Sequence, residues 1–86
     1  MANNAKQILV FPNPATDMVI LGNLPASASR FLLTDVTGRI VGSYAITQVH
    51  NGSYALSVGA YASGAYFYTL SDNAGELLQR GKLVKQ

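Results

Sequence analysis

Hydrophobic and polar residues alternate along most of this chain, in short runs separated by Gly, Pro, Asn and Asp. In residues 53–58, for example, every second side chain is large and apolar, so one face of an extended segment meets a core and the other meets water. Such breaks at intervals of roughly 8 to 12 residues are typical of an all-β sandwich or barrel. We expect about seven strands, near residues 7–11, 17–22, 29–35, 39–46, 52–58, 64–72 and 76–85.

Two of the breaks have distinct turn chemistry. Pro12-Asn13-Pro14 removes two backbone donors, so no strand ladder continues through it and the chain must turn or kink there. In the break that follows the third strand, Asp35 can bond forward into the turn and Gly38 can take a positive φ, which predicts a hairpin.

The last two strands are predicted to form a second hairpin. Residues 64–70 are not strongly polar on either face, which favours a central position in a sheet. Residues 71–76 read as the turn that follows. Gly81, within the final strand, indicates a bulge or a close approach of another group to the backbone.

Composition limits the fold to one small domain, residues 1–86. With 86 residues, 49% hydrophobic and 12% charged, the chain has enough apolar surface for one core but not for two lobes with a deep cleft between them. It has no cysteine for a disulfide or a thiolate metal site, and no apolar run long enough to cross a bilayer. A net charge of +2 is too small to indicate nucleic-acid binding.

Charge and candidate chemistry point away from catalysis. The four acidic residues all fall at predicted turns or strand ends, and the single histidine, His50, lies beside an Asn-Gly turn signal. We therefore expect no catalytic residues, no metal and no cofactor. Among the tyrosines, which alternate in the predicted strands, only Tyr61 falls in a loop-like stretch; the others are expected in the core. Arg80, Lys82 and Lys85 make the end of the chain cationic, as in an edge strand protected by charge.

Four motifs occur in order along the chain. They are Val10-Phe11-Pro12-Asn13-Pro14-Ala15-Thr16-Asp17 followed by Val19-Ile20, Asp35-Val36-Thr37-Gly38-Arg39-Ile40-Val41, Gly64-Ala65-Tyr66 with Leu70, and Lys82-Leu83-Val84-Lys85. Together they resemble the type A C-terminal sorting domain of the bacterial type IX secretion system, over a region from Ile8 to the last residue. Tyr61, where Leu is more usual, and Leu70, where Ile or Val is common, are mild departures from the family pattern.

The resemblance implies an immunoglobulin-like antiparallel β-sandwich that is a secretion signal and not an enzyme. It implies a covalently linked N-terminal cargo that passes through the periplasm, crosses the outer membrane and reaches the cell surface or the medium. The implied partners are an outer-membrane translocon and a sortase-like protease that removes the domain and attaches the cargo to surface lipopolysaccharide. The implied recognition residues are Gly64, Tyr66, Lys82, Leu83, Val84 and Lys85, and the implied structural motif residues are Pro12, Asn13, Pro14, Asp35, Gly38 and Arg39.

Several interpretations stay open at this stage. Gly64 and Tyr66 are explained equally well by a special backbone angle and a core ring. Lys82 and Lys85 are better recognition candidates, because exposed charges on an unpaired last strand contribute little to folding. A fibronectin-like or carbohydrate-binding adhesion module that uses Tyr61 is the main alternative, and a homodimer through a strand edge is a third.

Overall fold

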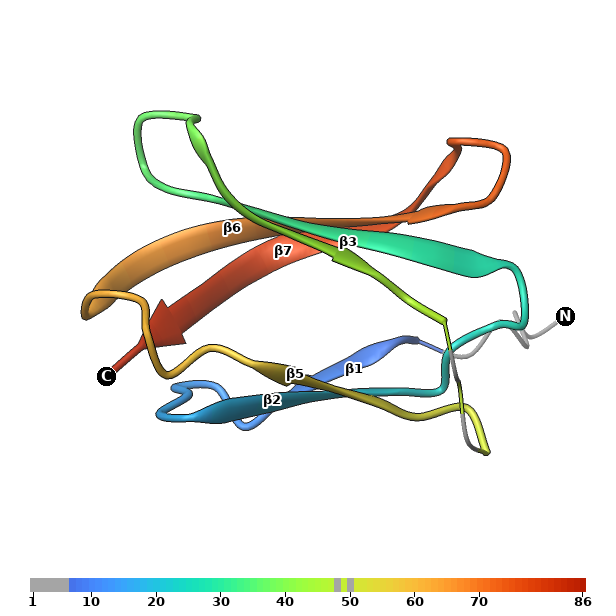
Figure 1. The fold of residues 1–86 in the computed structure, drawn as a ribbon, viewed down its shortest axis with the longest axis horizontal. Helices are drawn as coiled ribbons and strands as arrows, with labels where there is room; N and C mark the ends of the chain where they lie inside the picture. Colours follow the sequence, from blue (N-terminus) through green and yellow to red (C-terminus); the bar gives the residue numbers. More distant parts are fainter. Residues whose placement is uncertain (1–6, 48, 50) are drawn as a thin grey trace, which may run out of the picture.

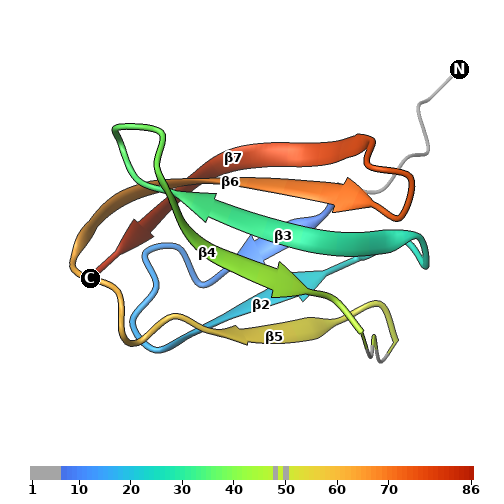
Figure 2. The ribbon, with the colours of Figure 1, turned by 45° about the horizontal axis from the view of Figure 1, so that its top comes forward.

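The computed structural model describes residues 7–47, 49 and 51–86, which form two stacked β-sheets (Figures 1 and 2). One sheet has three strands in the order β1-β2-β5 and the other has four in the order β4-β3-β6-β7, and all neighbouring strands are antiparallel. The strands are β1 (Leu9–Phe11), β2 (Met18–Gly22), β3 (Ala28–Thr34), β4 (Ile40–Ala45), β5 (Tyr54–Ser57), β6 (Gly64–Asp72) and β7 (Leu77–Lys85).

The predicted architecture is confirmed. Each expected segment contains or closely overlaps one of the strands, and β6 lies centrally, between β3 and β7. Within the described residues there is no helix long and apolar enough to cross a membrane. His50 lies outside the described residues, so its predicted loop position is not tested.

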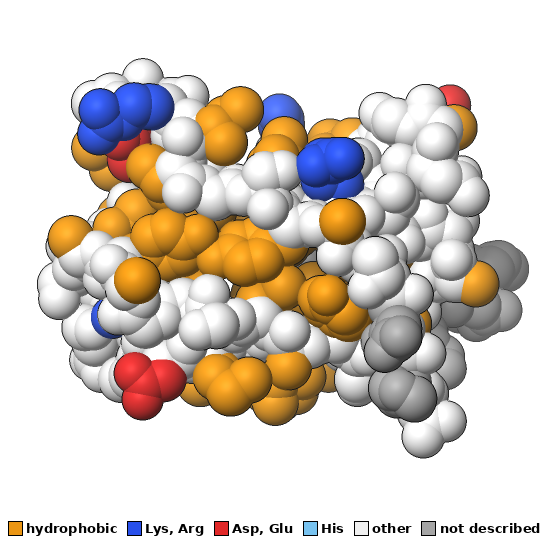
Figure 3. Space-filling view, viewed as in Figure 1, with side chains coloured by type: hydrophobic (Ala, Val, Ile, Leu, Met, Phe, Trp, Pro, Cys, Tyr) orange, Lys and Arg blue, Asp and Glu red, His pale blue; other side chains and the backbone are white. Residues whose placement is uncertain are grey.

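Alternation within the strands builds the core between the two sheets. The largest fully buried side chains come from both layers, with Phe31 and Leu70 in the four-stranded sheet and Leu21 in the three-stranded sheet. Phe31 stacks on Tyr68 with ring centroids 5.3 Å apart. On the side shown in Figure 3, apolar side chains are visible between the layers.

The two hairpins of the four-stranded sheet contain the same five-residue turn. In residues 35–39 and 72–76 the first residue is Asp, its N–H donates to the carbonyl oxygen of the fifth residue at 2.9 Å, and its own carbonyl accepts from the Gly N–H at 3.0 Å. Gly38 and Gly75 have φ of 90° and 84°, a left-handed conformation that favours glycine. Both predicted hairpins are therefore confirmed, and both follow from the pattern Asp-x-x-Gly.

Gly81 marks a close approach and not a bulge. A Cβ atom at this position would lie 2.8–2.9 Å from the ring and hydroxyl atoms of Tyr68, its cross-strand neighbour. The irregular pairing between β6 and β7 occurs elsewhere, between Leu70 and Ser71. A side chain at residue 81 would displace the Tyr68 ring. Because residue 81 is glycine, the ring packs directly against the backbone there.

Candidate recognition site at the C-terminal strand

The two motifs expected to carry recognition lie side by side. At the start of β6 and the end of β7, Gly64 pairs with Lys85, Ala65 with Val84 and Tyr66 with Leu83. Phe67 then pairs with Lys82, so the next residue of β6 completes the block. Six candidates from two separate parts of the sequence thus occupy one end of one strand pair.

The Pro-Asn-Pro motif joins them from the other sheet. After β1 the chain crosses to the outer edge of β7, where the Asn13 side chain donates to the Lys82 carbonyl oxygen and accepts from the Val84 N–H, both at 2.9 Å. The Ala15 N–H donates to the Val84 carbonyl oxygen, and the Gln86 N–H donates to the Ala15 carbonyl oxygen, both at 2.8 Å. Ala15 and Lys85 form an isolated parallel bridge.

The prediction that the last strand has an unpaired edge is therefore wrong at this end of β7. Its edge from Lys82 to Gln86 is occupied by residues 13–15. Farther along, the Gln79 side chain bonds the N–H and C=O of Ile8 at 3.1 and 2.8 Å, as a neighbouring strand would. A short flanking segment of the first sheet thus pairs with an edge that the sequence pattern alone leaves open. The homodimer through a strand edge stays a prediction.

All four motifs gather at one end of the sandwich (Figures 1 and 2). The hairpin that follows β3, the loop after β1, the start of β6 and the C-terminus lie at the same end, whereas β1 begins nearer the opposite end. The register explains this arrangement, because Thr34 at the end of β3 pairs with Phe67, which pairs with Lys82. Motifs from four separate parts of the sequence thus form one region of the fold.

Gly64 and Tyr66 have structural roles in this region. Gly64 is exposed and has a φ of 153°, with open space where a Cβ would stand, so its backbone conformation accounts for the glycine. Tyr66 is buried, and its hydroxyl donates to the Ala62 carbonyl oxygen at 2.6 Å. A tyrosine at the start of this strand that bonds backbone a few residues upstream is a recurrent feature of immunoglobulin-like sandwiches.

The two lysines of the terminal motif differ in exposure. Lys82 is exposed, but Lys85 is 9% exposed and its Nζ donates to the Gln86 carbonyl oxygen at 2.8 Å. The expectation that both are exposed is therefore wrong for Lys85. The reason is strand parity: Leu83 is a core residue, and Lys85, two positions later, points to the same inner side.

The Asp35 turn is a self-contained hydrogen-bonded unit. One carboxylate oxygen of Asp35 accepts from the Thr37 hydroxyl at 2.6 Å and from the N–H groups of Thr37 and Arg39 at 2.9 and 3.1 Å. The other oxygen forms an ion pair with the Arg39 guanidinium at 3.2 Å. The Thr37 hydroxyl bond, reinforced by the two N–H groups and the Arg39 charge, lowers the pKa of Asp35 from its usual 3.8. Asp35, Gly38 and Arg39 thus shape the turn.

Tyr61 is not an exposed platform for a ligand. It is half-buried between the layers, its hydroxyl lies 2.5 Å from the Tyr44 hydroxyl, and its ring lies against Gly42. The Tyr44 hydroxyl also donates to the Ser57 carbonyl oxygen at 3.0 Å, which links β4 to β5. Burial, followed by the bond to Tyr61, raises the pKa of Tyr44. The adhesion-module alternative therefore loses the aromatic residue on which it relied.

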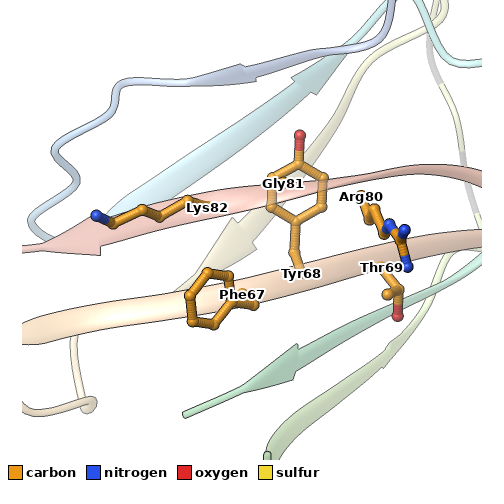
Figure 4. Close-up of a pocket in the computed structure, with 6 residues that line it drawn as sticks. All are labelled: Phe67, Tyr68, Thr69, Arg80, Gly81 and Lys82. Carbon is orange, nitrogen blue, oxygen red and sulfur yellow. The ribbon is translucent and has the colours of Figure 1, made fainter. Parts of the chain in front are cut away.

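A further surface was missed in the sequence. On the outer face of β6 and β7, Phe67, Thr69, Arg80 and Lys82 surround a groove of about 520 Å³, with Gly81 and Tyr68 also lining it (Figure 4). The available signal was the pairing of Phe67 with Lys82 and of Thr69 with Arg80, which puts all four side chains on one face. Among the described residues, no cluster of three His, Cys, Asp or Glu side chains could hold a metal ion.

Comparison with known proteins agrees with this arrangement. The family model described as the secretion system C-terminal sorting domain matches residues 9–86. A search of curated proteins finds no match. Among solved structures, the crystal structure of CopC from Methylosinus trichosporium OB3b is similar, with a TM-score of 0.52 and 18% sequence identity over 92% of this chain and 91% of that one. That likeness supports an immunoglobulin-like sandwich and, at this identity, the fold alone.

The family match covers all four motifs and nearly the whole of the described chain. A sorting domain of this family is a secretion signal for a fused cargo and not a catalyst. It engages the secretion machinery that delivers the cargo to the cell surface or the medium. The chain thus belongs to the family of C-terminal sorting domains of the type IX secretion system.

Proposed function

We propose that the outer-membrane translocon recognises the end of the sandwich where the four motifs meet, and that a sortase-like protease then removes the domain from its cargo and attaches the cargo to surface lipopolysaccharide. The cargo is N-terminal to the domain and passes through the periplasm on its way. This recognition depends on Gly64, Tyr66, Lys82, Leu83, Val84 and Lys85, of which Lys82 contacts the partner and the others hold the geometry of the site.

The observation that carries this proposal is the convergence of the motifs. The Asp35 hairpin is explained by hydrogen bonds within its own turn. By contrast, no interaction between neighbouring residues requires residues 13–15 to lie against residues 82–86. A composite surface of this kind exists only in the folded domain, so it can serve as a test of folding before transport. Lys82 is exposed there and free to contact a partner, whereas Leu83 and Lys85 hold the strand end in place from the inner side.

The test fuses residues 1–86 to the C-terminus of an inert, periplasm-directed reporter in a bacterium with a working type IX system. We expect the reporter at the surface or in the medium, and in the periplasm when the translocon is deleted. Lys82→Ala should lower export, because it removes an exposed charge from a folded domain. Lys6→Ala is the matched variant, as it removes a charge of the same sign outside the residues that the family model matches.

Two results would overturn the proposal. One is a wild-type fusion that is folded and intact yet stays in the periplasm of the working strain. The other is normal export of the Lys82→Ala fusion. Deletion of the protease gene should separate the two steps, because the fusion should still leave the periplasm but keep its C-terminal domain.

A further inference from the structure

The outer face of the four-stranded sheet gathers positive charge. Arg30 on β3 and Arg80 and Lys82 on β7 all alternate with inward-facing residues and point away from the core. The four acidic residues of the chain lie instead in turns or at strand ends. Within the described residues the ion pair found is that of Arg39 with Asp35, in the hairpin turn. The three cations of this face therefore have no carboxylate of their own chain to neutralise them.

The same face exposes an aromatic ring beside the two cations of β7. Phe67 is 45% exposed although it sits in the central strand β6, where its cross-strand neighbours are Thr34 and Lys82. The groove beside it is floored by Gly81 and bounded by Arg80 and Lys82, which lie to either side of that glycine in Figure 4. Tyr68 and Thr69 point to opposite sides of β6, so Thr69 adds its hydroxyl on the groove side.

The spacing of the charges fits an extended chain. Arg80 and Lys82 are two residues apart on one strand, which places their side chains about 7 Å apart on the same face. Carboxylates at alternate positions of an extended segment have the same spacing. Arg30 lies two strands away from β7 and is also displaced along the sheet, because it pairs with Ser71 and not with Thr69 or Phe67; its guanidinium donates to the Ser43 hydroxyl at 2.8 Å. Arg80 and Lys82 thus stand beside the Phe67 ring, and Arg30 adds a third cation farther along the same face.

We propose that this face, made by Arg30, Phe67, Arg80 and Lys82, docks an extended acidic segment of a protein of the secretion machinery, with carboxylates at alternate positions and an apolar side chain against Phe67. The inference rests on the proposed function and adds the face and the chemistry of the partner. An acidic polypeptide fits better than a glycan, because the exposed polar side chains that line the groove are the two cations and the Thr69 hydroxyl, so charge dominates what it offers a ligand. Lys82 belongs both to this face and to the terminal motif, so the two surfaces are continuous.

The test uses a zero-length carbodiimide crosslinker, which joins a lysine amine directly to a carboxylate. The reporter fusion is crosslinked during secretion, and linked peptides are identified by mass spectrometry. We expect Lys82 joined to an Asp or Glu of a secretion-machinery protein. Arg80→Gln should lower the yield roughly twofold to fivefold, the range for one exposed charge pair, and Phe67→Ser should lower it as well. Lys6→Gln removes the same charge outside the residues that the family model matches and should leave the yield unchanged.

The outcomes separate this inference from the proposed function. A wild-type fusion that reaches the surface while Lys82 forms no link to any protein carboxylate would overturn the docking face alone. Equal loss of yield in Arg80→Gln and Lys6→Gln would also overturn it, because net charge would then explain the effect. Salt-sensitive binding of the purified domain to lipopolysaccharide vesicles, without a protein crosslink, would replace the acidic protein with an anionic glycolipid. Failure of the wild-type fusion to leave the periplasm would count against the proposed function.

Discussion

The N–H of Val84 donates a hydrogen bond to the side-chain oxygen of Asn13 at 2.9 Å, across 71 positions of the sequence. Because the same side chain donates to the Lys82 carbonyl oxygen, one amide satisfies a donor and an acceptor on the edge of β7, as an adjacent strand would. The Pro-Asn-Pro motif therefore holds the C-terminal strand in place through hydrogen bonds to its edge. Its two prolines lack N–H groups and leave the asparagine side chain to make the bonds.

Replacing this asparagine should loosen the end of β7. We expect Asn13→Ala to lower the free energy of unfolding by about 1–3 kcal/mol, because two hydrogen bonds of typical net value are lost. Amide hydrogen exchange at Val84 should accelerate. Asn13→Asp is the matched variant: it can still accept from Val84 but cannot donate to Lys82, so its loss should be intermediate. Unchanged exchange at Val84 in Asn13→Ala would contradict the fastening role.

The strands and turns of this protein could be read from its sequence because they depend on local patterns. Alternation predicts the strands, and the pattern Asp-x-x-Gly predicts both hairpins of the larger sheet. The contact of Asn13 with β7 could not be read in this way, since it joins distant segments through a single side chain. Burial of Lys85 could be predicted from the sequence, because Lys85 is two positions after Leu83 and alternation places both side chains on the inner face. The two lysines therefore differ in their surroundings although both belong to the terminal motif.

The ring of Tyr68 should make residue 81 intolerant of any side chain. The ring is stacked on Phe31, and its hydroxyl accepts from Gln79 at 2.9 Å, so it cannot move away without losing contacts. We expect Gly81→Ala to destabilise the domain by about 1–2 kcal/mol, the cost of overpacking less the gain from a less flexible unfolded chain. Gly22→Ala is the control, as its Cβ would meet side-chain atoms at an ordinary 3.4 Å or more. Denaturant midpoints that fall equally for both would argue against the role of Tyr68.

At Gly64 the effect of backbone strain on stability can be measured apart from the effect of a contact with a partner. Its φ of 153° is rare for residues with a side chain, yet no atom lies within 4 Å of the position a Cβ would take. We expect Gly64→Ala to lower the free energy of unfolding by about 1–3 kcal/mol through strain alone. Export of the reporter fusion should fall only as far as stability does. A variant of full stability that is not exported would instead show that a partner contacts Gly64 directly.

Stability at acidic pH should depend on Asp35. Its folded-state pKa is lowered from 3.8, mainly by the Thr37 hydroxyl bond, so the stabilisation is fully present above 3.8 and is lost as the pH falls through the folded-state value. We expect the wild type to exceed Asp35→Asn in free energy of unfolding by a constant amount above about pH 5, and this difference to shrink at lower pH. Urea unfolding of both proteins across this range measures it. A difference that does not change with pH would mean that the carboxylate charge is immaterial to the turn.

At high pH, by contrast, ionisation of Tyr44 should lower the free energy of unfolding. Its pKa in the folded state is raised above 10.0, first by burial and then by the bond to Tyr61, so the folded protein holds this proton more tightly than the unfolded chain does. The contribution of Tyr44 is therefore complete below pH 10.0 and falls as the pH rises above it. Tyr44→Phe should be less stable than the wild type at neutral pH, because the bond to the Ser57 carbonyl oxygen is lost, and less sensitive to pH above about 10. Unfolding of both proteins at neutral and alkaline pH, followed by tyrosinate absorbance, tests this: parallel pH profiles would show that Tyr44 ionises as freely in the folded state as in the unfolded chain.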